Sequence, residues 1–310
     1  MSLTLRFYLT PALFFIYSFV FAAAQEKKII TTREKYKGKT YTLEEVKTMR
    51  NKIKRSIVYG LAFREARVLE NLLKKAENAQ KDKKTAECAK LTAEAAELIR
   101  KINLEHPFRR EKNGDVILGG IRYSRKKNEI TFPAEVSYHP EMPVEVLICR
   151  SDSERVYETL FTAGIRPLHL QTILYIAGCM NGARTKNKKQ VRMGDVLHLS
   201  VRYKTKNGEV KERNIEDILT ADKKPEKNRK MLADWIFVGS SVYKGKLVSD
   251  LTGESVLVWS VSSSILAPSS DKVAGGAIHV EFKKYDDLPN HKKITFVLKP
   301  ILPDTGEGQN

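Results

Sequence analysis

The hydrophobic pattern of this sequence changes its period at His106-Pro107, and this change constrains the fold more than any other feature. Before it, apolar side chains recur every three or four residues, as they do along one face of an α-helix. After it, short β-branched and aromatic runs are separated by Gly, Asn, Asp and Pro, a pattern typical of strands and turns. Proline disfavours helix at the preceding residue, which supports a boundary here. The sequence therefore predicts an α+β protein, helical over residues 42–104 and β-rich over residues 107–303.

Residues 42–104 are predicted to form a coiled-coil-like helical hairpin. Thr42 and Glu45 fit a capping box, in which each side chain accepts a hydrogen bond from the other residue's backbone N–H. The charged segment 81–84 provides the turn, and Gly60 is a place for a bend. Small side chains on the second helix would let it approach the first closely, and the same arm could pair with another copy into a homo-oligomer. The packing face is expected to comprise Ala86, Ala89, Ala93, Ala96 and Ile99.

The β-rich part is expected to contain many short strands, with a tail at residues 304–310. The predicted strands are Val116–Leu118, Glu129–Phe132, Val144–Cys149, Val196–Tyr203, Trp235–Val238, Leu247–Val248, Ser255–Trp259, Ala277–Phe282 and Ile294–Leu298.

Two local signals refine this β-rich part. Asn207-Gly208 is a hairpin signal between two strand-like runs. Pro167 suits the first turn of one packed helix that ends at Gly178. Trp235 lies in an apolar run and is expected to be a core residue rather than a sugar platform.

Residues 1–24 are predicted to be an export signal. Arg6 is followed by the apolar stretch Phe7–Phe21 and by Ala22–Ala24, small residues of the kind a signal peptidase accepts. The alternative is an uncleaved membrane anchor, which would give the protein its membrane contact. A flexible basic lead is expected at residues 25–41, and the rest of the chain is expected in the periplasm or outside the cell.

The composition is that of a globular chain with a strong positive charge. Its 310 residues are 42% hydrophobic, which excludes a wholly disordered chain or a multi-span membrane protein. The 55 Lys and Arg against 37 Asp and Glu give a net charge of +18. Such a charge favours anionic envelope components as partners, although another protein remains an alternative. Export makes nucleic acid a poor candidate in vivo.

Two basic segments, residues 184–192 and 223–230, concentrate this charge. Both are expected to be loops, and if they project on one side they could grip a polyanion. The alternative is that their charge only keeps loops solvated. The cations of the first segment that we take as candidate binding residues are Lys186, Lys188, Lys189 and Arg192.

Glu158, Arg166 and His169 form the polar group that we would inspect first for binding or catalysis. Glu158 precedes an apolar strand-like run, and the other two lie at the start of the predicted helix. A carboxylate beside an arginine and a histidine can form a polar binding spot or a hydrolase site, but a structural ion pair satisfies the same desolvation need.

The three cysteines, Cys88, Cys149 and Cys179, allow one disulfide. Cys149 and Cys179 each end an apolar run and could meet in one core, where an exported protein would permit their oxidation. The alternative is that both are small buried apolar side chains.

No catalytic, nucleotide-binding or metal-binding motif occurs, and we expect no cofactor and no metal. The leading hypothesis is therefore a non-catalytic binding domain on a helical arm. The alternatives are a hydrolase with an unrecognised polar site near Glu158 and a scaffold that self-associates through residues 42–104.

An ordered series of short segments runs through the β-rich part. Its members are Glu129–Val136, Val144–Ile148, Tyr157–Phe161, Arg166–Leu170, Gly194–Val196, Trp235–Ser240, Gly245–Val248, Thr252-Gly253, Ile265-Leu266 and Ile294–Pro300. This series resembles the YdjY-domain family, which consists of uncharacterised exported bacterial proteins. The resemblance covers about residues 107–303 and implies bacterial origin and export, but it supplies no catalytic residues.

Overall fold

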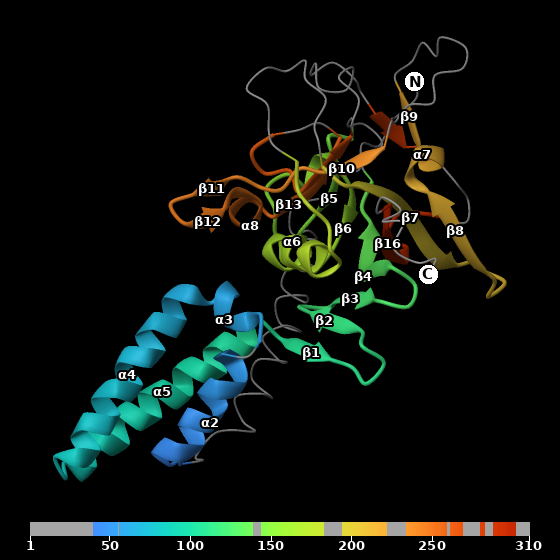
Figure 1. The fold of residues 1–310 in the computed structure, drawn as a ribbon. Helices are drawn as coiled ribbons and strands as arrows, with labels where there is room; N and C mark the ends of the chain where they lie inside the picture. The colour runs from blue at the N-terminus through green and yellow to red at the C-terminus, as the bar shows by residue number, and fades with distance from the viewer. Residues whose placement is uncertain are drawn as a thin grey trace, which may run out of the picture. The chain divides into compact units, whose positions relative to one another are not determined.

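A computed structural model mixes helix and sheet, which confirms the α+β class (Figure 1). Contacts divide the chain into two units, Met1–His106 and Pro107–Asn310, and the division falls where the hydrophobic period changes. The predicted leader and most of the basic lead lie outside the described residues. The structure describes residues 40–54, 56–138, 144–182, 194–221, 234–258, 261–268, 280–282 and 288–301.

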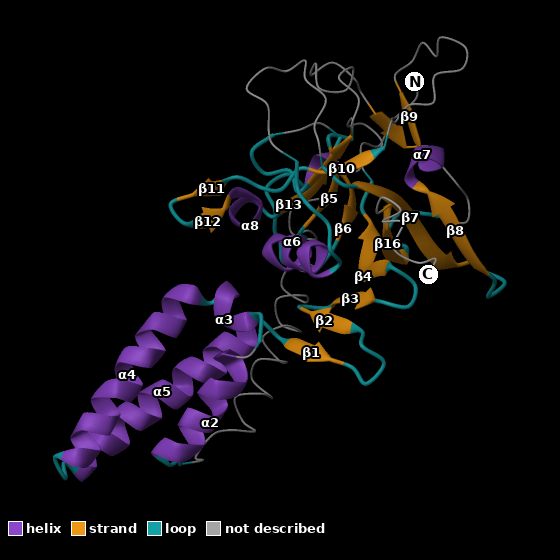
Figure 2. Cartoon of the chain, in the orientation of Figure 1, coloured by secondary structure: helices purple, strands orange, loops and turns teal. Residues whose placement is uncertain are grey.

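The first unit contains four helices in its described part: α2 (Leu43–Lys54), α3 (Val58–Leu61), α4 (Phe63–Lys81) and α5 (Thr85–Glu105) (Figure 2). The capping box is confirmed. The Thr42 backbone N–H donates to Glu45 Oε2 at 2.9 Å, and the Glu45 N–H donates to Thr42 Oγ1 at 3.3 Å.

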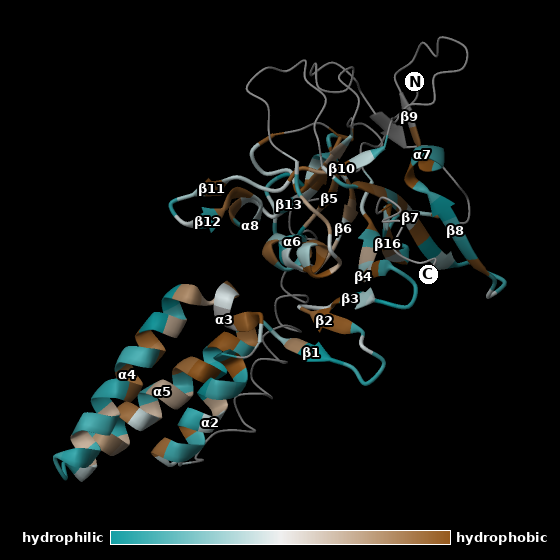
Figure 3. Cartoon of the chain, viewed as in Figure 1, coloured by the Kyte–Doolittle hydropathy of each residue, from teal (hydrophilic) through white to brown (hydrophobic). Residues whose placement is uncertain are grey.

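The face that α5 buries differs from the predicted one. Ala86, Ala89 and Ala93 are exposed, and only Ala96 and Ile99 of the expected face are buried. Alanine fits exposed and buried helix positions alike, so its spacing is a weak guide to the packed side. On α4, apolar bands alternate with polar ones along the helix (Figure 3). The buried residues are Ala66, Leu69, Leu73, Ala76 and Ala79 on α4, and Thr92, Ala95, Ala96, Ile99 and Ile102 on α5.

The second unit is built on a closed eight-stranded β-barrel. β4 pairs with β16 on one side and with β6 on the other, which closes the sheet. The strands around the barrel are, in order, β4 (Glu129–Val136), β16 (Lys293–Ile301), β7 (Val196–Lys204), β10 (Trp235–Phe237), β14 (Leu266–Pro268), β13 (Glu254–Leu257), β5 (Val146–Cys149) and β6 (Thr159–Thr162).

Shorter strands extend this barrel or stand beside it. A meander of β1 (Phe108–Arg110), β2 (Val116–Leu118) and β3 (Ile121–Ser124) continues from β4, and β8 (Val210–Asn214) continues from β7. Two separate pairs join β9 (Leu219–Ala221) to β15 (Val280–Phe282), and β11 (Val242–Tyr243) to β12 (Lys246–Leu247).

The predicted Asn-Gly hairpin is confirmed by the β7–β8 pairing, with Tyr203 opposite Lys211. Gly208 has a φ of +82° in its turn, a conformation that favours glycine.

Alternating side chains of the barrel strands fill its core. Phe132 of β4 stacks on Phe296 of β16 with ring centroids 5.4 Å apart, and Phe161 of β6 meets Phe296 edge-on. Trp235 is fully buried, as predicted, and its Nε1 donates to Glu216 Oε1 at 3.0 Å.

The helix predicted to start at Pro167 is confirmed as α6 (Pro167–Ile176). The prediction of a single packed helix is wrong, because α7 (Ile215–Ile218), α8 (Val248–Thr252) and the 3₁₀ turn η1 (Val156–Glu158) are also present. Val248, expected in a strand, begins α8. Tertiary bonds such as that from the Ser249 N–H to Ser240 Oγ, at 2.9 Å, override the β propensity of valine there.

The three cysteines are free thiols, so the Cys149–Cys179 disulfide is not formed. Cys149 packs with Val146 and Leu257, whereas Cys179 follows α6 and its N–H donates to the Leu174 carbonyl at 3.0 Å. Both side chains are buried, which agrees with the alternative of small apolar core residues.

Candidate functional site

One candidate site in the described part of the chain lies on the outer wall of the barrel. Along β4, Ile130 and Phe132 point into the core, so Glu129 and Thr131 point outward. Strand pairing aligns further polar residues with them, since Thr131 lies opposite Arg122 of β3. Similarly, β16 places Thr295 opposite Arg202 of β7, and outward side chains of four neighbouring strands thus meet.

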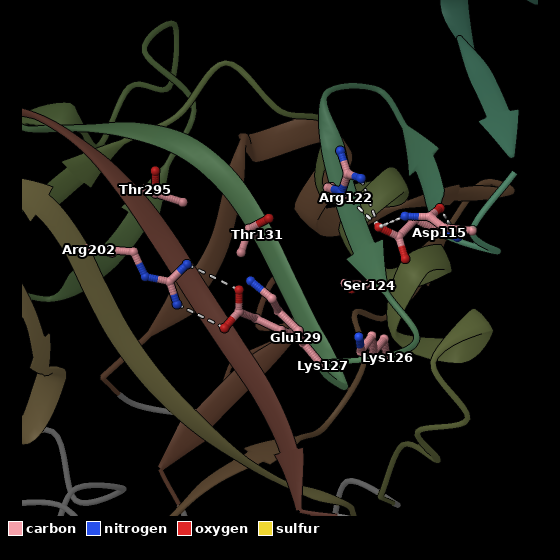
Figure 4. Close-up of a pocket in the computed structure, with 10 residues that line it drawn as sticks. Asp115, Arg122, Ser124, Lys126, Lys127, Glu129, Thr131, Arg202 and Thr295 are labelled. Atoms are coloured by element: carbon pink, nitrogen blue, oxygen red, sulfur yellow. Dashed lines mark hydrogen bonds and ion pairs between the residues drawn. The ribbon is translucent and has the colours of Figure 1, made fainter. Parts of the chain in front are cut away.

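These side chains line a cavity of about 440 Å³, here called the outer-wall pocket (Figure 4). In Figure 4, Arg122 turns toward Asp115 and Arg202 toward Glu129, with Lys126 and Lys127 from the β3–β4 turn between the two pairs. The pocket is lined by Asn113, Asp115, Arg122, Ser124, Lys126, Lys127, Glu129, Thr131, Arg202 and Thr295.

The first ion-pair group centres on Arg122. Its Nη2 donates to Asp115 Oδ2 at 2.8 Å and to Glu111 Oε2 at 2.5 Å. Asn113 Nδ2 also donates to Asp115 Oδ2, at 3.1 Å. The hydrogen bond from Arg122 outweighs desolvation and lowers the pKa of Asp115, so this carboxylate stays ionised.

The second group centres on Arg202. It forks onto both oxygens of Glu129, at 3.2 and 2.9 Å, and also donates to Glu212 Oε2 at 2.8 Å. Lys299 Nζ donates to Glu212 Oε1 at 3.1 Å. Burial alone would raise the pKa of Glu212. Hydrogen bonds from Ser200, Arg202 and Lys299 outweigh this effect and lower the pKa of Glu212 to about 2.

Lys126 and Lys127 differ from the other charged residues of the pocket. Both are exposed in the turn between β3 and β4, and within the described ranges neither has an ion-pair partner. The acids that line the pocket are already held by arginines. The uncompensated charge of the outer-wall pocket is therefore positive, and it suits an anionic group.

The polar group expected from the sequence is not one cluster. Glu158, in η1, pairs with Arg155 rather than with Arg166. Arg166 Nη2 instead donates to Asp250 Oδ2 at 2.6 Å, and the Leu168 N–H also donates to Asp250. The prediction that Glu158 and Arg166 pair is wrong, because the 3₁₀ turn η1 brings Arg155 to Glu158.

His169 is almost fully buried in α6 and lies against Gly119, in the turn between β2 and β3. This ring therefore packs in the interior of the second unit.

Arg155 holds more than one carboxylate. Its Nη2 donates to Glu145 Oε2 at 2.6 Å and its Nη1 to Glu254 Oε1 at 3.3 Å, in addition to the Glu158 pair. Burial, followed by the neighbouring Glu158, raises the pKa of Glu145. This cluster around Arg155 was not predicted, since its acids come from three separate segments.

Other sequence candidates are placed as follows. The cations of the basic segment, Lys186, Lys188, Lys189 and Arg192, lie outside the described residues, as does segment 223–230. In the part of the chain that the structure describes, no group of His, Cys, Asp and Glu is arranged to hold a metal ion. There, too, no helix has the length and apolar character needed to cross a bilayer.

The outer-wall pocket was missed because its residues are scattered in sequence. The alternation of Glu129 and Thr131 with apolar neighbours could have indicated an outward polar face, but not which strands pair with it. Comparisons with protein-family models, with curated proteins and with solved structures find no match.

Proposed function

We propose that this protein is a non-catalytic binding protein whose barrel holds an anionic partner in the outer-wall pocket. The observation that carries the proposal is the pair of exposed lysines, Lys126 and Lys127, beside acids that arginines already neutralise. Thr131, Thr295 and Ser124 add hydroxyl groups that can donate to the oxygens of an anion.

The partner that fits this chemistry best is a phosphate-bearing polymer of the cell envelope. Two neighbouring ammonium groups attract adjacent phosphates, and the net charge of +18 raises the local concentration of any polyanion. The basic segments 184–192 and 223–230 add to that charge.

Export and a helical arm complete the proposal. The apolar leader over residues 1–24 and the resemblance to the exported YdjY-domain family support a place outside the cytoplasm. The helices of residues 42–104 would serve as a spacer arm or as a self-association element.

The test is binding of the full chain to soluble inorganic polyphosphate over a range of salt concentrations. Lys126→Ala/Lys127→Ala is compared with Lys74→Ala/Lys75→Ala, which removes the same charge from exposed positions of α4. The pocket variant is expected to lower the affinity at least tenfold and to reduce the slope of log K against log salt by about 2. The α4 variant is expected to change both only slightly.

Equal losses in the two variants would contradict the proposal, because they would show that only total charge matters. Changing Lys186, Lys188, Lys189 and Arg192 together to Ala measures what the first basic segment adds. If that variant alone abolishes binding, the outer-wall pocket is not the site.

A further inference from the structure

A small hairpin stands beside the barrel and next to α8 (Figure 1). Its strands β11 and β12 pair with each other, with Val242 opposite Leu247 and Tyr243 opposite Lys246. The turn residues Lys244 and Gly245 have φ values of +47° and +74°. Positive φ at both central residues is the geometry that two-residue hairpin turns favour.

The base of this hairpin is fixed to the rest of the unit. The Ser240 N–H donates to Gln171 Oε1 of α6 at 2.9 Å, and Ser240 Oγ accepts from the Ser249 N–H of α8 at 2.9 Å. The Ser241 N–H donates to the Ser262 carbonyl at 2.9 Å. The anchored base therefore holds the tip in a defined exposed position.

The tip combines apolar and cationic side chains. Val242 is 67% exposed, Tyr243 is 57% exposed, and Leu251 on the adjoining α8 is 50% exposed. Lys244 and Lys246 are also exposed, and the Lys244 ammonium lies 5.2 Å from the centre of the Tyr243 ring. Asp250, the one acid between residues 240 and 252, is engaged by Arg166.

We propose that the tip of the β11–β12 hairpin inserts into the interface of an anionic lipid bilayer. Apolar side chains would enter the boundary between headgroups and acyl chains, and lysines would contact anionic headgroups. Tyrosine suits this boundary because its ring is apolar and its hydroxyl is polar.

A lipid surface fits better than a protein partner because the exposed patch is small. A stable protein interface involves about 20–30 residues on each side, whereas membrane contact gains from a few inserted side chains and from each nearby lysine. The inference is independent of the outer-wall pocket, since β11 and β12 contribute no residue to that cavity.

The experiment uses a local probe in the full chain. Tyr243→Trp is compared with Val210→Trp, because Val210 on β8 is likewise 57% exposed. Each variant is mixed with vesicles of brominated phosphatidylcholine, with or without phosphatidylglycerol. The fluorescence of the introduced tryptophan is followed after the emission of the unsubstituted protein has been subtracted. With phosphatidylglycerol present, we expect the tryptophan of Tyr243→Trp to be quenched and that of Val210→Trp to be quenched little. A local probe keeps the answer separate from any binding by the apolar leader.

The lysines are tested in the Tyr243→Trp background. Lys244→Ala/Lys246→Ala is expected to reduce the quenching at least twofold, because each lysine near an anionic surface adds to the attraction. Lys74→Ala/Lys75→Ala, which removes the same charge from exposed positions of α4, is expected to leave it nearly unchanged. Equal quenching at the two tryptophan positions, no quenching with either lipid, or a loss with the Lys74 pair as large as that with the Lys244 pair would each overturn the inference.

Discussion

At the scale of single residues, the contact between Gly119 and His169 shows how tightly the β2–β3 turn meets α6. Gly119 has a φ of +58°, and a Cβ at this position would lie 1.9 Å from His169 Nδ1. Two requirements therefore exclude a side chain there: the left-handed backbone and the ring of the histidine.

Gly119→Ala is expected to lower the free energy of unfolding by about 2–4 kcal/mol, from overpacking and backbone strain together. In the His169→Ala background the same change should cost less, because the ring is gone and only the strain remains. Urea unfolding of the four proteins measures this coupling. Additive effects of the two substitutions would show that the ring does not restrict Gly119.

The cysteines allow a second prediction at this scale. Burial raises the pKa of Cys149 to about 11 and that of Cys179 to about 12, so at pH 8 both are protonated and shielded. Cys88, on α5, is only partly buried. An aromatic disulfide reagent should thus label Cys88 first and the other two only after unfolding. Recovery of a single free thiol from the unfolded, unreduced protein would instead reveal a Cys149–Cys179 disulfide.

At the scale of elements, local signals predicted much of the fold, and long-range pairing escaped prediction. The capping box at Thr42, the helix at Pro167 and the Asn-Gly hairpin depend on neighbours in sequence, and all three are present. Closure of the barrel depends on β4 meeting β6 and β16, strands far apart in the chain. Tertiary packing decides such pairing, so the outer-wall pocket was not foreseeable.

The partner of Glu158 illustrates the same limit. Along a strand, residues three apart point to opposite faces, so Arg155 and Glu158 would be separated. In a 3₁₀ turn, residues three apart lie on the same side, and η1 brings the two together. The 3₁₀ turn therefore decides which arginine pairs with Glu158.

Glu145, which precedes β5, and Glu212, on β8, should respond to pH in opposite directions. Glu145 has a raised pKa in the folded state. Its ionisation therefore lowers the free energy of unfolding as pH rises above the unfolded-state pKa of about 4.3. Glu212 has a folded pKa of about 2, so its contribution is present above pH 4.3 and is lost as pH falls toward 2.

Glu145→Gln should therefore stabilise the protein more at pH 8 than at pH 4, whereas Glu212→Gln should destabilise it at pH 7 and have little effect near pH 2. Each difference is expected to be about 1 kcal/mol or less, because solvent screens both sites. Thermal unfolding across pH measures them. Parallel pH profiles for the two variants would contradict the assigned pKa directions.

At the scale of the whole molecule, closure and charge act together. The closed barrel pairs its eight strands without a free edge. Outside the barrel, β8 pairs only with β7 among the described strands, and its charged residues Lys211, Glu212 and Arg213 disfavour pairing of its other edge with a second chain. With a net charge of +18, some attraction to polyanions is expected of any exposed surface of this protein. Binding of a polyanion alone is thus weak evidence for the outer-wall pocket, and the place on the protein where the polyanion binds decides the question.

The most direct test of the central proposal locates the anion on the folded chain. Amide NMR shifts of the ¹⁵N-labelled protein are followed during titration with short-chain polyphosphate at physiological salt. We predict that the largest shifts occur at Ser124–Thr131 and at Thr295, around the outer-wall pocket. Large shifts confined to the basic segments 184–192 and 223–230, with none at Lys126 and Lys127, would contradict the proposal.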